Sequence, residues 1–296
     1  MRILILGVTG MLGHKMHDVL SQRHDVTGTT RSSPATLQVD ARPFFRRGRV
    51  LEGVDVTDLA GLRTLVGDLR PETVVNCVGV IKQRDAAHDA ATSIAINALL
   101  PHQLEDICAS QGSRLIHFST DCVFSGSKGD YSEEDPSDAD DLYGRTKYLG
   151  EVAGDHALTI RSSIIGRELD HFQSLLEWFL HQRGEVPGFT RAIYTGVTTL
   201  QMAVLLDRVL VEQPQLSGVY QVASDKITKF DLLFMIREHF GLHDQIELVP
   251  DDAFACDRSL RGDLFSDTTG IAIPKWEDQI AHLAEDAKRY GSVTDG

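Results

Sequence analysis

Three glycines that follow the first apolar run constrain the fold of this chain more than any other feature. The run Arg2–Leu6 has the composition of a buried strand, and the spacing Gly7-x-x-Gly10-x-x-Gly13 comes directly after it. Apolar residues then recur at helical spacing over residues 12–20. The N-terminus is therefore predicted to be a strand, a tight glycine-rich turn and a helix that packs closely against the strand.

The same alternation of strand and helix continues through the first half of the chain. Crossovers of this length join parallel strands, so helices should cover both faces of the sheet. The sequence therefore predicts an α/β fold, a Rossmann-like doubly wound parallel sheet. Further strands are expected at 26–30, 50–56, 73–78 and 114–118, and helices at 59–69 and 86–111, with a kink or a break at Pro101.

The second half is less regular. Strands are expected at 158–162, 219–222 and 246–249, and helices at 171–182, 200–211, 229–240 and 275–290. We expect residues 1–165, together with about 192–224, to form the Rossmann domain. Residues 166–191 and 225–296 should form a smaller, mostly C-terminal α/β lobe that binds the substrate, because ligands of such sheets bind outside the strand ends.

The charge balance excludes several classes of partner. The chain has 43 acidic and 29 basic residues, a net charge of −14. Nucleic acids and anionic membranes both attract basic surfaces, so neither is expected as a partner. No apolar stretch approaches the ~20 residues of a membrane span, and the N-terminus lacks the features of a signal peptide. Four scattered cysteines, without spaced histidines, predict reduced thiols, a cytoplasmic protein and no metal.

The glycine loop is typical of a dinucleotide site. Glycines let the backbone approach a pyrophosphate, and the helix that follows supplies free amides and the positive end of its dipole. The position of the loop between a strand and a helix supports this interpretation. The residues expected to bind the cofactor here are Gly7, Gly10, Met11, Leu12 and Gly13.

The end of the second strand indicates which cofactor is bound. It reads Thr29-Thr30-Arg31-Ser32, without the carboxylate that binds the ribose 2′-hydroxyl of NAD. Arg31 suits the 2′-phosphate of NADP, so we expect NADP (NADPH), with NAD as the alternative. Asp55 and Val56 end the third predicted strand, where a carboxylate could accept a hydrogen bond from the adenine amine. A structural cap is the competing explanation for Asp55.

Two further motifs connect the chain to a known superfamily. Tyr143 and Lys147 lie four residues apart, on one face of a predicted helix, and Ser119-Thr120-Asp121 closes the fifth strand. With the glycine loop, in this order and at these distances, the motifs resemble the extended short-chain dehydrogenase/reductase superfamily.

The resemblance is closer to the reductases of nucleotide-linked 4-keto-6-deoxy sugars, the dTDP-4-dehydrorhamnose reductase group. It covers most of the chain. It rests on the segments Ser119–Gly126, Gly218–Ser224 and Pro274–Trp276, and on Glu151 after the Tyr–Lys pair. Cys122 replaces the Tyr of the group's motif, and the group's Arg-Pro-x-x-Ser-x-Leu segment is altered at residues 257–260.

The resemblance implies that Thr120, Tyr143 and Lys147 are catalytic. A tyrosine hydroxyl can protonate the ketone oxygen as hydride arrives, but its ordinary pKa is ~10. We expect the Lys147 ammonium to lower the pKa of Tyr143 and to hold the nicotinamide ribose. Thr120 should hydrogen-bond the carbonyl oxygen.

Other contacts are expected on both sides of the site. On the cofactor side they are Cys77, Val78 and Gly79, which end the fourth strand, and Asn97 of the long helix. On the substrate side they are Lys82, Asp121, Val123 and Arg258. We favour Arg258 for the pyrophosphate of the substrate, because an acidic protein must supply a cation locally.

These features predict NADPH-dependent reduction of a nucleotide-linked 4-keto-(6-deoxy)sugar, in the synthesis of deoxysugars or surface-polysaccharide precursors. The expected partner is the nucleotide-sugar substrate, and a homodimer is left open. Two alternatives remain: an epimerase that retains NAD(P), and a non-catalytic NADP-binding regulatory subunit. The intact Thr120–Tyr143–Lys147 set argues against the regulatory subunit.

Overall fold

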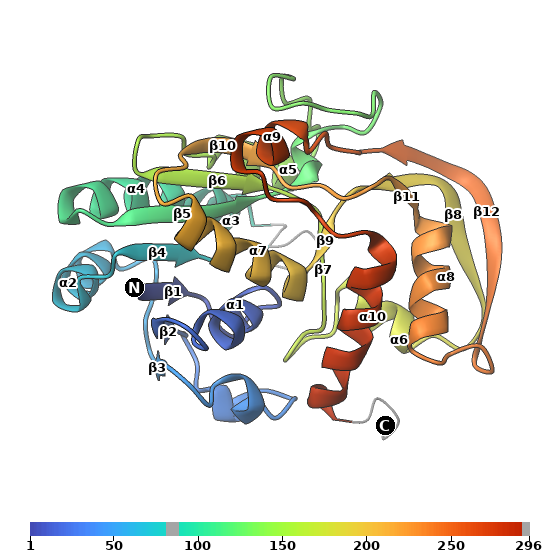
Figure 1. Cartoon of the computed structure of the whole chain (residues 1–296), viewed down its shortest axis with the longest axis horizontal. Helices are drawn as coiled ribbons and strands as arrows, with labels where there is room; N and C mark the ends of the chain where they lie inside the picture. The colour runs from blue at the N-terminus through green and yellow to red at the C-terminus, as the bar shows by residue number, and fades with distance from the viewer. Residues whose placement is uncertain (81–88, 292–296) are drawn as a thin grey trace.

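The computed structural model describes residues 1–80 and 89–291, and they form a seven-stranded parallel sheet with helices on both faces (Figure 1). The strand order is β3-β2-β1-β4-β5-β6-β10, and every neighbouring pair is parallel. The strands are β1 (Arg2–Leu6), β2 (Asp25–Thr29), β3 (Arg49–Leu51), β4 (Thr73–Asn76), β5 (Arg114–Ser119), β6 (Ala157–Arg161) and β10 (Gly218–Gln221). The predicted doubly wound Rossmann-like fold is confirmed.

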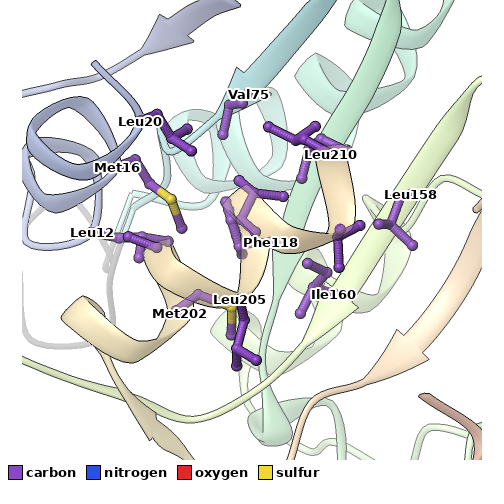
Figure 2. Close-up of a cluster of buried hydrophobic side chains, with 14 of the residues drawn as sticks. Leu12, Met16, Leu20, Val75, Phe118, Leu158, Ile160, Met202, Leu205 and Leu210 are labelled. Atoms are coloured by element: carbon purple, nitrogen blue, oxygen red, sulfur yellow. The ribbon is translucent and has the colours of Figure 1, made fainter. Parts of the chain in front are cut away.

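Each face of this sheet has its own hydrophobic core. On one face lie α1 (Gly13–Leu20) and α7 (Thr199–Glu212), and Figure 2 shows Met16 of α1 and Met202 of α7 pointing toward the same apolar cluster. On the other face lie α2 (Leu59–Leu69) and α4 (Leu100–Gln111). Strands covered on both faces can be apolar throughout, which explains why β1 reads as an uninterrupted apolar run.

A smaller lobe carries a second sheet and a third core. Its strands are ordered β11-β8-β12, namely β11 (Ile227–Thr228), β8 (Gly184–Tyr194) and β12 (Ile246–Asp257). Three helices pack with them: α6 (Leu175–Leu180), α8 (Lys229–His239) and α10 (Trp276–Ala287). The short strands β7 (Ile164–Ile165) and β9 (Val197–Thr198) pair separately. The exact domain boundaries given above stay a prediction.

The remaining elements connect these layers. They are η1 (Pro34–Thr36), η2 (Arg42–Phe44), α3 (Ala90–Ser93), η4 (Ile94–Leu99), η5 (Asp121–Val123), α5 (Leu142–Leu149), α9 (Asp263–Thr269) and η6 (Lys288–Tyr290). No helix within the described residues is long and apolar enough to span a membrane.

Two predicted elements are shorter than expected, for backbone reasons. The third strand ends at Leu51 and not at Val56, because Gly53 turns the chain with a φ of +74°. The helix predicted over 171–182 begins only at Leu175. His171 and Phe172 have φ values of +69° and +48°, which a right-handed helix does not allow.

The sequence predicts a kink or a break at Pro101, and the helix is not broken there. The chain stays helical from Ala90 to Gln111, but the stretch Ile94–Leu99 has π-helical hydrogen bonding. Pro101 lies in the first turn of α4, directly after this stretch. A proline is tolerated in the first turn of a helix because the amide that it lacks has no partner within the helix there. The wider π-helical turn before Pro101 therefore lets the chain stay helical.

The largest error concerns the second sheet. The 11-residue β8 was not expected, and β12 continues to Asp257 instead of ending at Val249. Gly184, Pro187 and Gly188 in β8, and Pro250 in β12, are residues that strands usually avoid. The two strands pair with each other over most of their length, and this long-range pairing overrides the local preference.

Candidate active site

The candidate active site is a cleft at the carboxyl ends of the parallel strands. The strand order reverses between β1 and β4, and ligands of doubly wound sheets bind at such a reversal. The cleft has a volume of about 470 Å³. It is lined by the glycine loop, by the segments that follow β4 and β5, by α5, and by residues of β8 and β12 in the smaller lobe.

The glycine loop has the shape that a pyrophosphate needs. Gly7 has a φ of +82°, a backbone conformation that favours glycine. A Cβ on Gly13 would lie 2.1 Å from the carbonyl oxygen of Gly7, so the helix start touches the strand end. Gly10, Met11 and Leu12 line the cleft, at the start of α1. The loop therefore offers backbone amides to an anion, as the dinucleotide prediction requires.

The end of β4 continues the cofactor side of the cleft. Cys77, Val78 and Gly79 all line it. Asn97 lies on the π-helical stretch and does not line the cleft. It holds the loop after β4, which forms one wall of the cleft. Its side-chain oxygen accepts from the Val80 amide at 2.8 Å, and its nitrogen donates to the Val80 carbonyl at 2.9 Å. Asn97 is thus placed to keep this loop in position.

The residues predicted for the adenosine end lie beside the cleft rather than in its lining. Arg31 is exposed just after β2, and Val56 packs against a core cluster. Asp55 accepts from the amide and the hydroxyl of Thr57, at 2.9 and 2.8 Å. These two bonds lower the pKa of Asp55, and the Arg31 guanidinium adds to the effect. Asp55 therefore caps the local turn, which is the competing explanation for this residue. It also lies near Arg31.

Thr120, Tyr143 and Lys147 come together in the cleft. Thr120 follows β5, and its hydroxyl donates to the Asp121 carboxylate at 3.0 Å. Tyr143 and Lys147 lie one turn apart on α5, whose start is capped by Asp141. The Lys147 ammonium donates to the Phe118 carbonyl at 2.6 Å, and this buried bond ties α5 to the end of β5.

The pKa values of this group differ from the expectation in one respect. Burial raises the pKa of Tyr143, the nearby Cys122 adds to the increase, and a hydrogen bond with Thr120 opposes it. The prediction of a lowered pKa for Tyr143 is therefore wrong for the protein alone. Burial lowers the pKa of Lys147 itself to about 8, while Glu151 opposes the shift. Tyr143 keeps its proton at neutral pH, which is the form that a general acid needs.

A buried ion pair holds the end of α5, the helix that carries Tyr143 and Lys147. The Arg161 guanidinium of β6 binds both carboxylate oxygens of Glu151, each at 2.7 Å. The Ser119 hydroxyl of β5 donates to the same carboxylate at 2.6 Å. Two-point pairing of this kind fixes orientation as well as distance. The end of α5 is thereby locked to the ends of β5 and β6.

The substrate side contains two of the four predicted residues. Arg258 and Asp121 both line the cleft. Arg258 donates through Nε to the Phe124 carbonyl at 2.9 Å, and its Nη1 lies 3.8 Å from the Cys122 sulfur. Burial raises the pKa of Asp121, and the positive charge of Arg258 opposes this effect.

The other two predicted substrate residues are not placed in the cleft. Val123 is fully buried in a small apolar cluster with Phe124 and Tyr131, so its side chain does not reach a ligand. We do not retain it as a substrate contact. Lys82 lies in the segment 81–88, outside the described residues.

Sequence reasoning missed the contribution of β8 and β12. Tyr194, at the end of β8, lines the cleft, and burial together with the nearby Asp121 raises its pKa to about 12. Phe254 and Cys256 line it from β12. The spacing Phe254, Cys256, Arg258 is that of one strand face, so extending the predicted strand to Arg258 would have found them. In the described part of the chain, no group of His, Cys, Asp or Glu is arranged to hold a metal ion.

Known proteins resemble this chain at the level of sequence. A dTDP-4-dehydrorhamnose reductase of Streptomyces griseus is 33% identical over 153 residues, which are 51% of this chain and 44% of that protein. The chain thus matches less than half the length of this relative. A methionine adenosyltransferase 2 subunit beta of Pongo abelii is 32% identical over 265 residues, 81% of this chain and 72% of that protein.

Solved structures and a family model cover nearly the whole chain. The dTDP-4-dehydrorhamnose reductase of Bacillus anthracis, solved in complex with NADP, matches with a TM-score of 0.77 at 18% identity, over 96% of this chain and 99% of that one. At this identity the match shows the shared fold. The model of the family described as the RmlD substrate binding domain matches residues 1–289, and the chain belongs to this family.

Proposed function

We propose that this chain is an NADPH-dependent reductase of a nucleotide-linked 4-keto-(6-deoxy)sugar, in the synthesis of deoxysugars or surface-polysaccharide precursors. The observation that carries the proposal is the convergence of Thr120, Tyr143 and Lys147 on the cleft that the glycine loop lines. A protein that only binds a dinucleotide has no need of a buried proton donor beside it. The Streptomyces griseus relative is a dTDP-4-dehydrorhamnose reductase, which supports the same reaction class.

Tyr143 is the proposed general acid. Its raised pKa keeps the phenol protonated, and its bond with Thr120 aims the hydroxyl. A ketone oxygen placed between these two hydroxyls would accept from Tyr143, and it would accept from Thr120 once the single Thr120 proton turns to it from the Asp121 carboxylate. As negative charge develops on that oxygen, Tyr143 transfers its proton, a step worth typically ~10²–10⁴-fold in rate.

Lys147 has two proposed roles. Its ammonium has three donors and uses one on Phe118, so the others are free for ribose hydroxyls of the cofactor. Its charge also stabilises the phenolate that Tyr143 leaves behind. Bound NADPH would supply the hydride. The proposed cofactor-site residues are Gly7, Gly10, Met11, Leu12, Gly13, Arg31, Asp55, Val56, Cys77, Val78, Gly79, Asn97, Tyr143 and Lys147. Among them Asn97 acts through its bonds to Val80.

On the substrate side we propose Arg258 and Asp121. The guanidinium of Arg258 uses its Nε on the backbone, and its outer nitrogens remain for the diphosphate or the sugar. The buried carboxyl of Asp121 can bind a sugar hydroxyl. On sequence grounds we also keep Lys82 as a contact to the diphosphate.

The long match to a methionine adenosyltransferase subunit favours a second candidate function. That relative is covered over 72% of its length, more than the 44% of the Streptomyces griseus reductase. In this case the chain would bind NADP and a partner enzyme without turning over a sugar. The ordered Thr120–Tyr143–Lys147 group makes this the weaker candidate.

The test is oxidation of NADPH in the presence of dTDP-linked and UDP-linked 4-keto-6-deoxy sugars, followed by the nicotinamide absorbance. Oxidation with at least one sugar, and none without sugar, supports the reductase. NADPH binding without oxidation by any sugar contradicts it. Analysis of the same mixtures for inverted sugars then separates an epimerase from a regulatory subunit.

Two further proposals concern the state of the protein. We place it in the cytoplasm, where unpaired thiols such as Cys77 and Cys108 stay reduced. We also propose a homodimer through the outer faces of η4 and α5, because Ile94, Leu99 and Leu149 are exposed there. Light scattering of the purified protein tests the dimer, and a monomeric mass would contradict it.

A further inference from the structure

A largely buried cluster of charged and aromatic residues, with Arg289 at its exposed rim, joins the first helix to the C-terminal end of the described chain. We call it the C-terminal clasp. Its members come from α1, from α10 and from η6: His14, Lys15, Asp18, Asp286, Arg289 and Tyr290. None of these six lines the cleft, and the reductase account uses none of them.

Ion pairs hold the two ends of the clasp together. The fully buried Lys15 ammonium lies 2.5 Å from the Asp286 carboxylate, and Arg289 lies 2.5 Å from Asp18. Arg289 also donates to the Pro43 carbonyl at 2.9 Å, and the Lys15 ammonium stands 4.4 Å above the centre of the Phe44 ring. The first pair joins α1 to α10, and the second joins α1 to η6.

A chain of two hydrogen bonds runs from the clasp to the glycine loop. His14 Nδ1 lies 2.9 Å from the Gly10 carbonyl oxygen, which also accepts from the His14 backbone amide at 3.1 Å, and His14 Nε2 lies 2.5 Å from the Tyr290 hydroxyl. Burial and the Lys15 charge lower the pKa of His14 to about 3, so the ring is neutral and carries one proton. A carbonyl only accepts, so Nδ1 must donate to Gly10 and Nε2 must accept from Tyr290.

The side to which the Gly10 carbonyl points also determines where the next amide, that of Met11, points. In a trans peptide the carbonyl and the following amide point in opposite directions, and the described chain has no cis peptide. With the Gly10 carbonyl turned toward His14, the Met11 amide is turned away from His14. Gly10 and Met11 both line the cleft, and an amide at a helix start that points away from the helix is available to an anion.

We propose that Tyr290 is a positioning residue for the glycine loop: acting through His14, it fixes the Gly10–Met11 peptide and so sets the affinity for the phosphates of the dinucleotide. The part about affinity rests on the proposed cofactor binding. The part about loop position does not depend on it. Tyr290 lies 276 residues from His14 in the chain, so the clasp couples the C-terminal turn to the first loop.

The test compares Tyr290→Phe with wild type by two readouts. The first is hydrogen–deuterium exchange of the backbone amides in a peptide that spans residues 7–13. The second is the equilibrium Kd for NADPH. Phenylalanine keeps the ring in place but leaves Nε2 of His14 without a donor, so we expect faster exchange and a roughly five- to tenfold weaker Kd.

Two control variants separate positioning from simple loosening. Tyr148→Phe removes an exposed hydroxyl from α5 and should change neither readout. Arg289→Gln breaks the ion pair with Asp18 but keeps the Tyr290 hydroxyl. It should lower the Tm while leaving the NADPH Kd within about twofold of the wild-type value, as expected for a contact that adds stability only.

Three results would overturn the proposal. They are unchanged exchange in Tyr290→Phe, faster exchange with an unchanged Kd, or an equal loss of affinity in Arg289→Gln. If wild type binds no dinucleotide, the proposed function fails instead. The exchange readout then decides the positioning role alone, with faster exchange in Tyr290→Phe supporting it and unchanged exchange refuting it.

Discussion

Asn97 and Val80 exchange two hydrogen bonds, at 2.8 and 2.9 Å, between a helix and the loop that follows β4. The backbone of Asn97 also touches α5, because a Cβ on Gly150 would lie 1.9 Å from the Asn97 carbonyl oxygen. One residue therefore connects the proposed cofactor wall to the helix that carries Tyr143 and Lys147. The π-helical stretch around Asn97 brings it into this position.

Asn97→Ala should lower the free energy of unfolding by about 2–3 kcal/mol, because it leaves a buried amide and a buried carbonyl of Val80 without partners. Urea denaturation measures this value. The matched control is Gln111→Ala, which removes an exposed amide near the end of α4. A loss below ~0.5 kcal/mol in both variants would show that the pair contributes little.

Arg31→Ala should weaken NADPH binding by about tenfold or more and leave NADH binding within about twofold, because only NADPH carries the 2′-phosphate. Titration with each cofactor measures both constants. Arg46→Ala removes another exposed guanidinium after β2 and should affect neither cofactor. Equal losses for NADPH and NADH in Arg31→Ala would remove this residue from the phosphate site.

The value of kcat/KM should fall above about pH 8, by about tenfold per pH unit, because Lys147 loses its proton with a pKa of about 8. The protonated form is the active one, so activity is complete below this pH. In Lys147→Met the plateau should be lower and this alkaline limb absent. An alkaline limb that survives in Lys147→Met would assign it to another group.

The same shift makes an independent prediction about stability. Between about pH 8 and pH 10.5, the unfolded chain holds a proton on Lys147 that the folded chain has lost. The free energy of unfolding should therefore gain a contribution that rises with pH in this window. Denaturation curves of wild type and Lys147→Met across the window test it, and parallel curves for the two proteins would contradict it.

Arg258→Ala should raise the KM for the nucleotide sugar by about tenfold or more, because a charged partner of the diphosphate is lost. The Kd for NADPH should not change. Arg261→Ala is the control, since its exposed guanidinium pairs with Asp263. A KM equal to the wild-type value would show that the diphosphate binds elsewhere.

The main sheet could be predicted from the sequence because its signals are local. Each buried strand is a short apolar run, and each helix repeats its apolar face within a few turns. The second sheet could not, because β8 and β12 are stabilised by pairing with each other across more than fifty residues of sequence. The positive φ values of His171 and Phe172 also could not be predicted, because the spacing of apolar residues does not depend on them.

The candidate site, like the fold, has residues that the sequence predicts and residues that it does not. Thr120, Tyr143 and Lys147 could be predicted from motif spacing, and the structure brings them to one cleft. Tyr194 could not, because it reaches the cleft at the end of β8, a strand that the local sequence pattern does not predict. The raised pKa of Tyr143 also could not be predicted from the sequence. It depends on burial and on the nearby Cys122, neither of which the motif spacing reveals.

Tyr143→Phe tests the central claim most directly. The variant loses only a hydroxyl, so it should bind NADPH within about twofold of wild type while its rate of NADPH oxidation with an active sugar falls by ~10²–10⁴-fold. Thr120 and Lys147 remain in place as an internal control on the site. Near wild-type oxidation by Tyr143→Phe would contradict the assignment of Tyr143 as the general acid.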